Sequence, residues 1–192
     1  MVCACNVFTN ENGVITGHLT DGAGFVQNLK KHGVSVENQN IVIFGAGGAS
    51  AAIQAQLAME GAKEIHIFNP KDKFFERAEQ LKETISKNCP NCRLTVNDSA
   101  DQAVLAEKIA GCGIVVNATT MGMAPFEEVS LVDPAFFRKG LVVADTVYHP
   151  EKTKLLREAE QAGCIVIGGR GMLQQQGAVN FKLFTGKEMP LD

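Results

Sequence analysis

A glycine-rich turn lies in this sequence between an apolar run and a segment of small residues, and it narrows the possible folds more than any other segment does. The β-branched run Ile41–Phe44 is followed by Gly45-Ala46-Gly47-Gly48-Ala49-Ser50 and then by alanine-rich residues as far as Glu60. Glycine allows a sharp turn and lets the backbone approach an anion with no Cβ in the way. A helix that begins near Gly48 would direct its free N–H groups and positive dipole end at a phosphate. The pattern therefore predicts a strand–turn–helix that seats a pyrophosphate.

The third fixed position of this glycine pattern is Ser50 rather than glycine. Serine is small enough for close packing of a helix on a strand, so the dinucleotide interpretation holds. A glycine triplet by itself is a weak signal, and an ordinary strand–turn–helix corner is the alternative. The strand before the turn and the long small-residue helix after it favour the dinucleotide site.

The rest of the chain alternates between apolar runs and helix-forming segments, which indicates βαβ units and a parallel sheet. Such runs suit strands that are buried on both faces. We expect a doubly wound, three-layer α/β/α Rossmann sheet. Strands are expected near 41–45, 63–69, 93–97, 113–117, 141–146 and 164–167, and helices near 48–60, 73–88, 101–110, 152–162 and 171–184.

The N-terminal residues predict a different unit. Cys5–Phe8 and Val14–Gly17 read as the two strands of a β-hairpin around the turn Asn10–Gly13. A helix is expected over Asp21–His32, with Gly33 stopping it. We therefore divide the chain into a hairpin-and-helix unit, residues 1–33, and a dinucleotide-binding domain with a C-terminal helix, residues 34–192.

Charge and hydropathy exclude several classes of protein. The 192 residues carry a net charge of −3 with both signs interspersed, so nothing favours binding to nucleic acid or to an anionic membrane. No apolar run approaches the roughly 20 residues of a membrane-spanning helix. The N-terminus lacks the basic flank of a secretory signal. We expect a soluble cytoplasmic protein.

The six cysteines raise the possibility of a metal or redox site. Cys89-Pro90-Asn91-Cys92 has the spacing of a zinc or redox pair, and Cys3-Ala4-Cys5 offers a second pair. However, Pro90-Asn91 is typical of a turn between a helix and a strand, and a redox pair normally opens a helix. We expect no metal and interpret these thiols as structural or incidental.

In an open α/β sheet, ligands bind at the carboxyl ends of the strands. These ends supply the expected cofactor contacts, in addition to the glycine turn at residues 45–50. They are Asn69, Lys71, Asp72, Asn117, Thr119, Met121, Val147, Gly171 and Met172.

The end of the second predicted strand bears on the type of cofactor. An acidic side chain there accepts hydrogen bonds from ribose hydroxyls and repels a 2′-phosphate, whereas arginine binds that phosphate. Asn69 can bond a ribose without distinguishing NAD from NADP. Lys71 could bind the 2′-phosphate of NADP, and Asp72 could instead bond the ribose hydroxyls of NAD. Because no arginine lies between Asn69 and Asp72, we favour NAD, with NADP or the use of both left open.

Several ordered motifs make the chain resemble the shikimate/quinate dehydrogenase family from Cys3 onward, and most closely its quinate/shikimate branch. Gly17–Gly22 is similar to the family's G-[HY]-N-T-D-G, and residues 45–50 match its G-A-G-G-A-[SA]. Its N-x-T-x-x-G-M, D-x-x-Y-x-P-x-x-T-x-L-L and closing-helix motifs correspond to residues 117–123, 145–156 and 171–181.

The resemblance implies hydride transfer between NAD(P) and a secondary alcohol of shikimate or quinate. It places Asp21 as the catalytic, substrate-binding partner of a lysine, and Asn6, Tyr148 and Gln176 as further substrate contacts. It also places Met172 beside the nicotinamide. For Asp21 the alternative role is a helix cap, and for Tyr148 it is a packed aromatic side chain.

The resemblance also implies an N-terminal substrate domain, whose carboxylate-binding serines and proton-transferring lysine have no counterpart here. We therefore interpret residues 1–33 as the remnant of that domain and expect a truncated chain that is poorly active alone. The alternatives are a non-catalytic nucleotide-binding or interaction module, and an oxidoreductase completed by a partner chain. We also expect exposed apolar faces that include Phe25, Val26 and Phe181, and hence a homo-oligomer.

Overall fold

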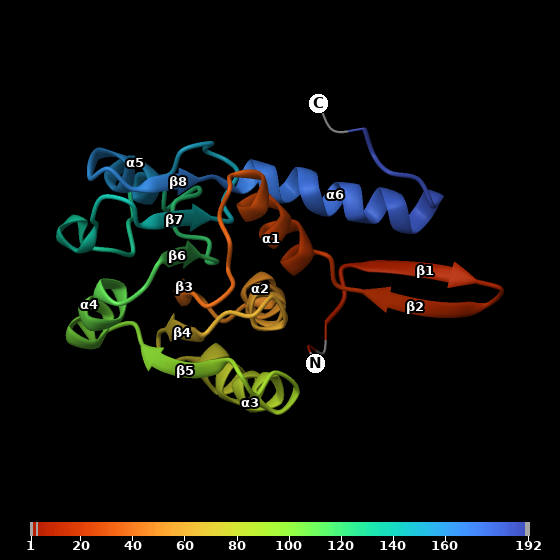
Figure 1. Ribbon diagram of the computed structural model, residues 1–192, viewed down its shortest axis with the longest axis horizontal. Helices are drawn as coiled ribbons and strands as arrows, with labels where there is room; N and C mark the ends of the chain where they lie inside the picture. The colour runs from red at the N-terminus through yellow and green to blue at the C-terminus, as the bar shows by residue number, and fades with distance from the viewer. Residues whose placement is uncertain (1, 3, 191–192) are drawn as a thin grey trace.

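The computed structural model describes residues 2 and 4–190, and its centre is a six-stranded parallel sheet with helices on both faces (Figure 1). The strand order is β5-β4-β3-β6-β7-β8. This order places the first strand of the domain, β3, beside the first strand of its second half, β6. The doubly wound α/β prediction is confirmed. The strands are β3 (Asn40–Phe44), β4 (Glu64–Asn69), β5 (Arg93–Asp98), β6 (Ile114–Asn117), β7 (Val142–Asp145) and β8 (Ile165–Ile167).

Side chains alternate between the two faces of the sheet and form two separate cores. Ile41 and Ile43 belong to one buried cluster, whereas Val42 and Phe44 belong to the other. Because each strand is buried on both sides, its sequence is a continuous apolar run. The helices that cover the faces are α2 (Gly48–Met59), α3 (Lys73–Asn88), α4 (Gln102–Ala110), α5 (Lys154–Gln161), α6 (Gly169–Thr185) and the short η1 (Pro134–Phe136).

Helix α1 (Asp21–Lys31) packs against α2 and α6, which corrects one expectation. Phe25 and Val26 are each only 1% exposed, because they lie in the core between these helices. Glycine makes the close approach possible, since a Cβ on Gly24 would lie 2.7 Å from the Cβ of Gln176. The prediction that Phe25 and Val26 form an exposed apolar face is therefore wrong, and Phe181 is only half-exposed.

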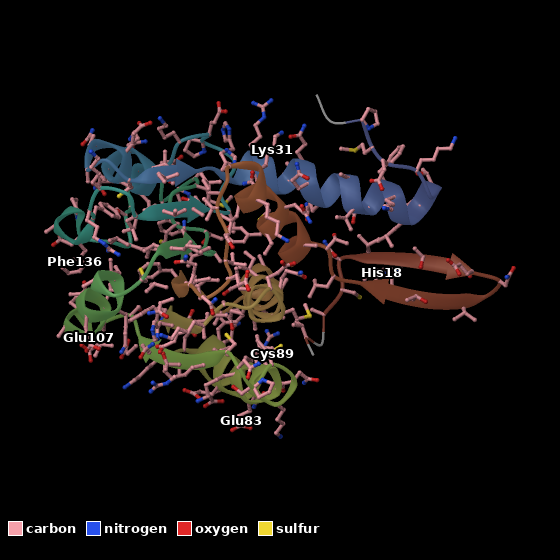
Figure 2. The ribbon with its side chains drawn as sticks, viewed as in Figure 1. His18, Lys31, Glu83, Cys89, Glu107 and Phe136 are labelled. Atoms are coloured by element: carbon pink, nitrogen blue, oxygen red, sulfur yellow. The ribbon has the colours of Figure 1, made fainter. Side chains whose placement is uncertain are left out.

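The hairpin projects from the rest of the molecule as a two-stranded antiparallel ribbon, β1 (Val7–Glu11) and β2 (Val14–His18), with His18 marked at its base in Figure 2. The tight turn is Asn12-Gly13, with φ of 51° and 88°. Two residues with positive φ are the signature of a type I′ hairpin turn. Asn10 therefore lies inside β1 rather than in the turn, and the first strand runs three residues further than the sequence predicted.

The cysteines of the turn between α3 and β5 behave as structural residues. The amide of Cys92 donates to the carbonyl of Cys89 at 3.0 Å, which matches the Pro-Asn turn expected from the sequence. Figure 2 labels Cys89. Cys92 is buried, and burial raises the pKa of its thiol to about 11. Cys112 is likewise buried, whereas Cys164 is half-buried. Cys3 lies outside the described residues.

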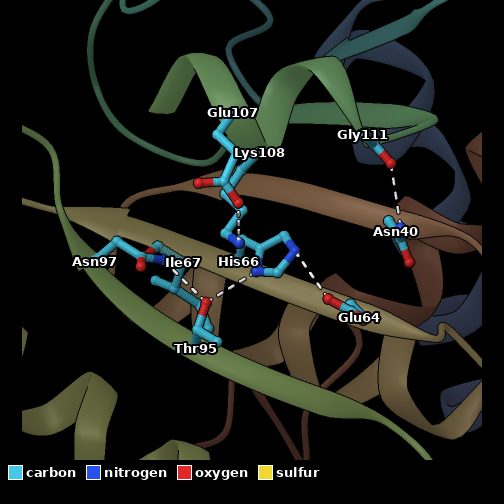
Figure 3. A network of polar contacts seen from close by, with 9 residues as sticks. All are labelled: Asn40, Glu64, His66, Ile67, Thr95, Asn97, Glu107, Lys108 and Gly111. Carbon is cyan, nitrogen blue, oxygen red and sulfur yellow. Dashed lines mark hydrogen bonds and ion pairs between the residues drawn. The ribbon is translucent and has the colours of Figure 1, made fainter. Parts of the chain in front are cut away.

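One buried polar network lies away from the carboxyl ends of the strands (Figure 3). His66 on β4 is 4% exposed, and its Nδ1 is 2.9 Å from the Thr95 hydroxyl. Its Nε2 lies 3.3 Å from a carboxylate oxygen of Glu64. Burial, together with the positive charge of Lys108, holds the pKa of His66 below its ordinary value.

Two searches of the described residues, 2 and 4–190, bear on other functions. Within this part of the chain, no group of three or more His, Cys, Asp or Glu side chains could hold a metal ion. No helix in the same part is both long enough and apolar enough to cross a bilayer.

Candidate functional site

The glycine turn closes tightly at the carboxyl end of β3. Gly45 has φ of +100°, and a Cβ there would lie 2.7 Å from the carbonyl oxygen of Ala118. Only glycine fits this conformation in this space. The hydroxyl of Ser50 donates to the Gly45 carbonyl at 2.6 Å and accepts from the Gln54 amide at 2.9 Å. Ser50 is fully buried, and its hydrogen bonds therefore tie the turn to the first residues of α2.

The N-terminus of α2 is left open toward solvent. Gly47 is its N-cap and supplies no side-chain hydrogen bond, and the first turn of the helix has no acidic residue. A Cβ added to Gly47 or Gly48 would meet nothing within 4 Å. The amide groups of this first turn therefore face free space, which is the arrangement that an anion requires.

A cavity of about 1000 Å³ lies over the carboxyl ends of the strands and includes the glycine turn. A cavity of this size accommodates a large organic ligand. The predicted residues that line it are Gly45, Ala46, Gly47, Gly48, Ala49, Asn69, Asp72, Thr119, Met121, Val147 and Tyr148. The predicted residues outside this lining are Asn6, Asp21, Ser50, Lys71, Asn117, Gly171, Met172 and Gln176.

The cavity also has walls that the sequence analysis missed. Phe74 on α3 and Ser99, just after β5, line it on one side. Ser99 follows a strand end as the other candidates do, so its position was a usable signal. Leu131 lines the cavity from a long irregular segment, and no sequence pattern marked that residue.

The loop after β4 is organised by its own side chains. The amide of Asn69 donates to the Pro70 carbonyl at 2.8 Å and to the Asp72 carboxylate at 2.9 Å. That carboxylate also caps α3 by accepting from the Phe74 amide at 2.9 Å. Lys71 is not part of the cavity lining, and its ammonium lies 3.7 Å from the Asp98 carboxylate. The negative charge at the cavity wall therefore comes from Asp72.

The loop after β6 is held by Asn117, which is 1% exposed. Its amide nitrogen donates to the Met121 carbonyl at 2.9 Å, and its oxygen accepts from the amide and the hydroxyl of Thr119 at 3.0 and 2.7 Å. Asn117 thus lies beneath the cavity wall and shapes it, while Thr119 and Met121 form its surface.

Asp145, at the end of β7, is a buried carboxylate next to Asn117. One oxygen accepts from the Asn117 amide at 3.0 Å and from the Val147 backbone amide at 2.8 Å. The other accepts from the Thr153 hydroxyl at 2.7 Å. Burial raises the pKa of Asp145, and the hydrogen bonds from Thr153, Val147 and Asn117 oppose that rise.

A second polar cluster joins the hairpin to α1. The amide of Asn6 donates to the Asp21 carboxylate at 2.8 Å and to the Thr20 hydroxyl at 3.1 Å, while its oxygen accepts from the Thr20 amide at 2.9 Å. The N-cap of α1 is Thr20, with no side-chain capping bond, so Asp21 is not a helix cap. Burial raises the pKa of Asp21, and the bond from Asn6 opposes it.

The remaining predicted residues lie around α6 and the cavity rim. Gln176 packs against Gly24, and within the described residues its buried Oε1 has no hydrogen-bond donor. Gly171 contacts Asn28, and Met172 is buried in the core. Tyr148 is 57% exposed at the cavity rim, so it is not a packed core aromatic residue. The structure thus brings together Asn6 and Asp21 but keeps this pair outside the cavity lining.

No family model matches the chain. It is 45% identical over its whole length to a quinate/shikimate dehydrogenase from Escherichia coli, of which it covers 67%. Among solved structures it resembles a shikimate 5-dehydrogenase from Listeria monocytogenes in complex with shikimate and NAD, with 44% identity and a TM-score of 0.94, over 97% of this chain and 65% of that one. It also resembles a quinate dehydrogenase from Corynebacterium glutamicum in complex with NAD, with 30% identity and a TM-score of 0.85, over 96% and 64% of the two chains. The chain therefore spans about two thirds of the length of these relatives.

Proposed function

Since the chain belongs to the quinate/shikimate dehydrogenase family, we propose that it binds NAD(P) in the cavity and takes part in hydride transfer to or from a secondary alcohol of shikimate or quinate. The observation that carries this proposal is the uncapped N-terminus of α2 behind the glycine turn. When bound, the nicotinamide cofactor supplies the hydride acceptor or donor.

The residues of the turn fit a pyrophosphate. Gly47 and Gly48 leave room at the point where an anion would meet the first amides of α2. Gly45 and Ser50 hold the turn rigid, so the amide groups are oriented before the ligand arrives. Organisation before binding lowers the entropic cost of association.

We propose NAD as the preferred cofactor, with NADP as the weaker one. Asp72 presents a carboxylate at the cavity wall, which accepts hydrogen bonds from ribose hydroxyls and repels a 2′-phosphate. Lys71, the cation that could offset this repulsion, is directed toward Asp98 instead. The Listeria and Corynebacterium relatives are complexes with NAD, whereas a shikimate dehydrogenase of 34% identity is a complex with NADP+, so the preference rests on Asp72.

For the alcohol we propose that Asn6 and Asp21 form the substrate contact, together with Gln176 and Tyr148. Asn6 fixes the orientation of the Asp21 carboxylate by a 2.8 Å bond. Partial burial raises the pKa of Asp21, which brings a carboxyl group closer to the range in which it can exchange protons with a substrate. The family's lysine has no counterpart in this sequence, so we expect slow turnover by the chain alone.

The test is a calorimetric titration of the protein with NAD and with NADP, followed by assays of shikimate and quinate oxidation. The assays are run with and without an added substrate domain from a relative. We expect tighter binding of NAD than of NADP, and turnover that increases when the substrate domain is added. Asp21→Asn is the matched variant, which should keep the affinity for NAD and lose turnover.

The outcomes separate the candidate functions. Failure to bind either nucleotide would contradict the proposal at its first step. Binding without turnover in any mixture would instead support the non-catalytic nucleotide-binding module.

A further inference from the structure

The two loops at the ends of β6 and β7 are tied together by one buried carboxylate. Asn117 and Asp145 are direct neighbours in the register of these parallel strands, and an Asn117-to-Asp145 hydrogen bond of 3.0 Å joins their side chains. Asp145 is 1% exposed, and both of its oxygens accept hydrogen bonds. A buried charge with this many donors is held firmly in one position.

Each partner of this carboxylate fixes a different part of the cavity wall. Through Asn117 it reaches Thr119, whose amide and hydroxyl donate to the Asn117 oxygen, and Met121, whose carbonyl accepts from the Asn117 amide. Directly, through the amide of Val147, it fixes the turn that carries Thr146 to His149 into the lining.

Thr153 completes the arrangement from the start of α5. Its hydroxyl donates to Asp145 at 2.7 Å and accepts from the Leu156 amide at 3.4 Å as the cap of that helix. The methyl group of Thr153 lies against the loop after β6, since a Cβ on Gly122 would be 2.9 Å from it. The side chain of Thr153, itself fully buried, therefore contacts both loops.

These loops belong to one half of the proposed dinucleotide site. In a sheet of this strand order, the two halves of the ligand bind on opposite sides of the point where the order reverses, here between β3 and β6. Asn69 and Asp72, at the ribose-reading strand end, lie on the β4 side. The loops held by Asp145 therefore face the nicotinamide half.

We infer that Asp145 is a positioning residue, which holds the nicotinamide side of the cavity in its binding shape through Asn117, Val147 and Thr153. This inference rests on the proposed function. It assigns to the aspartate a role in the affinity for one half of the cofactor and none for the other half.

The test compares NAD with ADP-ribose, which contains the adenosine and both phosphates but lacks nicotinamide. Asp145→Asn keeps the size of the side chain, but an NH2 group replaces one of the two accepting oxygens, so at least one of the donors from Asn117, Val147 and Thr153 loses its acceptor. Loss of one buried hydrogen bond predicts an increase of about tenfold in the Kd for NAD. The Kd for ADP-ribose should change by less than about twofold, the size of effect expected for a distant, independent site.

Thr153 provides a second pair of variants that does not alter the carboxylate. Thr153→Val removes the hydroxyl and should reproduce the selective loss of NAD affinity. Thr153→Ser keeps the hydroxyl and should retain the original affinity. Thermal unfolding of each variant shows whether it is folded. If Asp145→Asn does not fold, the comparison of Thr153→Val with Thr153→Ser still tests the positioning role of Asp145.

A loss of affinity that is equal for NAD and ADP-ribose would overturn the inference, because it would indicate a general structural role. Unchanged NAD affinity in Asp145→Asn and Thr153→Val would overturn it as well. Neither result touches the proposed cofactor site as long as the unaltered protein binds NAD. If the unaltered protein binds neither ligand, the proposed function fails and this inference fails with it.

Discussion

At the scale of single residues, two glycines of the same turn differ in what the fold demands of them. Gly45 is needed by the fold, since its φ is +100° and a side chain would meet the backbone of Ala118. Gly47 has ordinary backbone angles and free space around it, so the fold would accept a side chain there. The sequence motif presents both simply as glycine, and the structure separates the glycine that the fold needs from the one that it does not.

The first prediction uses this contrast. Gly45→Ala should lower the free energy of unfolding by about 2 kcal/mol or more, the cost of a strained backbone together with a close contact. Gly47→Ala should lower it by no more than about 1 kcal/mol, the difference between the two residues as helix caps. Urea denaturation measures both values.

The second prediction concerns the affinity of a folded variant for NAD, and here Gly47→Ala, the less destabilised variant, should show the larger effect. Gly47→Ala, which stays folded, should raise the Kd for NAD by more than about tenfold, because its methyl group occupies the space of the pyrophosphate. Calorimetry on the folded variant measures this value. Unchanged affinity in Gly47→Ala would mean that the turn does not contact the phosphates.

His66 gives the protein a predictable pH dependence. Its pKa is lowered in the folded state, mainly by burial and next by Lys108, while Glu64 opposes the effect. The unfolded chain therefore binds the proton more tightly than the folded one once the pH falls toward the ordinary value of 6.5. The free energy of unfolding should decrease as the pH falls below neutrality.

The variant His66→Gln isolates this contribution from those of Asp21 and Asp145, whose raised pKa values act in the opposite direction. Urea denaturation above and below pH 6.5 should show a smaller decrease in the variant than in the unaltered protein. An equal decrease in both proteins would exclude His66 as its source.

At the scale of elements, the sequence predicted the sheet and its helices well because local patterns determine them. Apolar runs gave all six strands, and Asp72, Asp101 and Thr153 cap their helices through bonds to backbone amides. The hairpin shifted because Asn12-Gly13 forms the turn instead of a longer loop. What local patterns could not give was the partner of α1, since burial of Phe25 and Val26 depends on α2 and α6.

Glycines allow α1 and α6 to approach each other, which leads to a prediction about this pair. A Cβ on Gly24 would lie 2.7 Å from the backbone nitrogen of Gln176, so Gly24→Ala should cost about 1–3 kcal/mol through overpacking. The matched control is Gly177→Ala in α6, where a Cβ meets nothing within 4 Å. The control should stabilise the protein by about 0.5–1 kcal/mol, because alanine favours a helix.

Urea denaturation of these two variants separates packing from helix propensity. If Gly24→Ala stabilised the protein as much as Gly177→Ala, the two helices would not be in close contact. A destabilised Gly24→Ala with normal far-ultraviolet circular dichroism would agree with a fold whose helices have been pushed apart.

At the scale of the whole molecule, the projecting hairpin is the part with the least stability of its own. A two-stranded ribbon is marginal by itself in water. Phe8 and Ile15 are 62% and 69% exposed, and the strand register places them on the same face, while Val14 is 66% exposed on the other. Exposed apolar residues of this kind favour association.

We therefore predict that the protein self-associates through the hairpin. Sedimentation velocity should show a dimer or larger species whose proportion rises with concentration. The double variant Phe8→Lys with Ile15→Lys, placed on one face, should shift the protein toward monomer. A monomer that persists at high concentration in the unaltered protein would contradict the prediction.

Local sequence patterns were enough to predict the parallel sheet, the glycine turn and several residues at the strand ends that line the cavity. The motifs also indicated the family. The three-dimensional contacts were needed to show that Asp145 and Asn117 join two loops, that Asp21 pairs with Asn6 instead of capping a helix, and that Phe25 is buried. Each of these depends on residues distant in the chain, and the periodicity of one segment carries no information about the segment that packs against it.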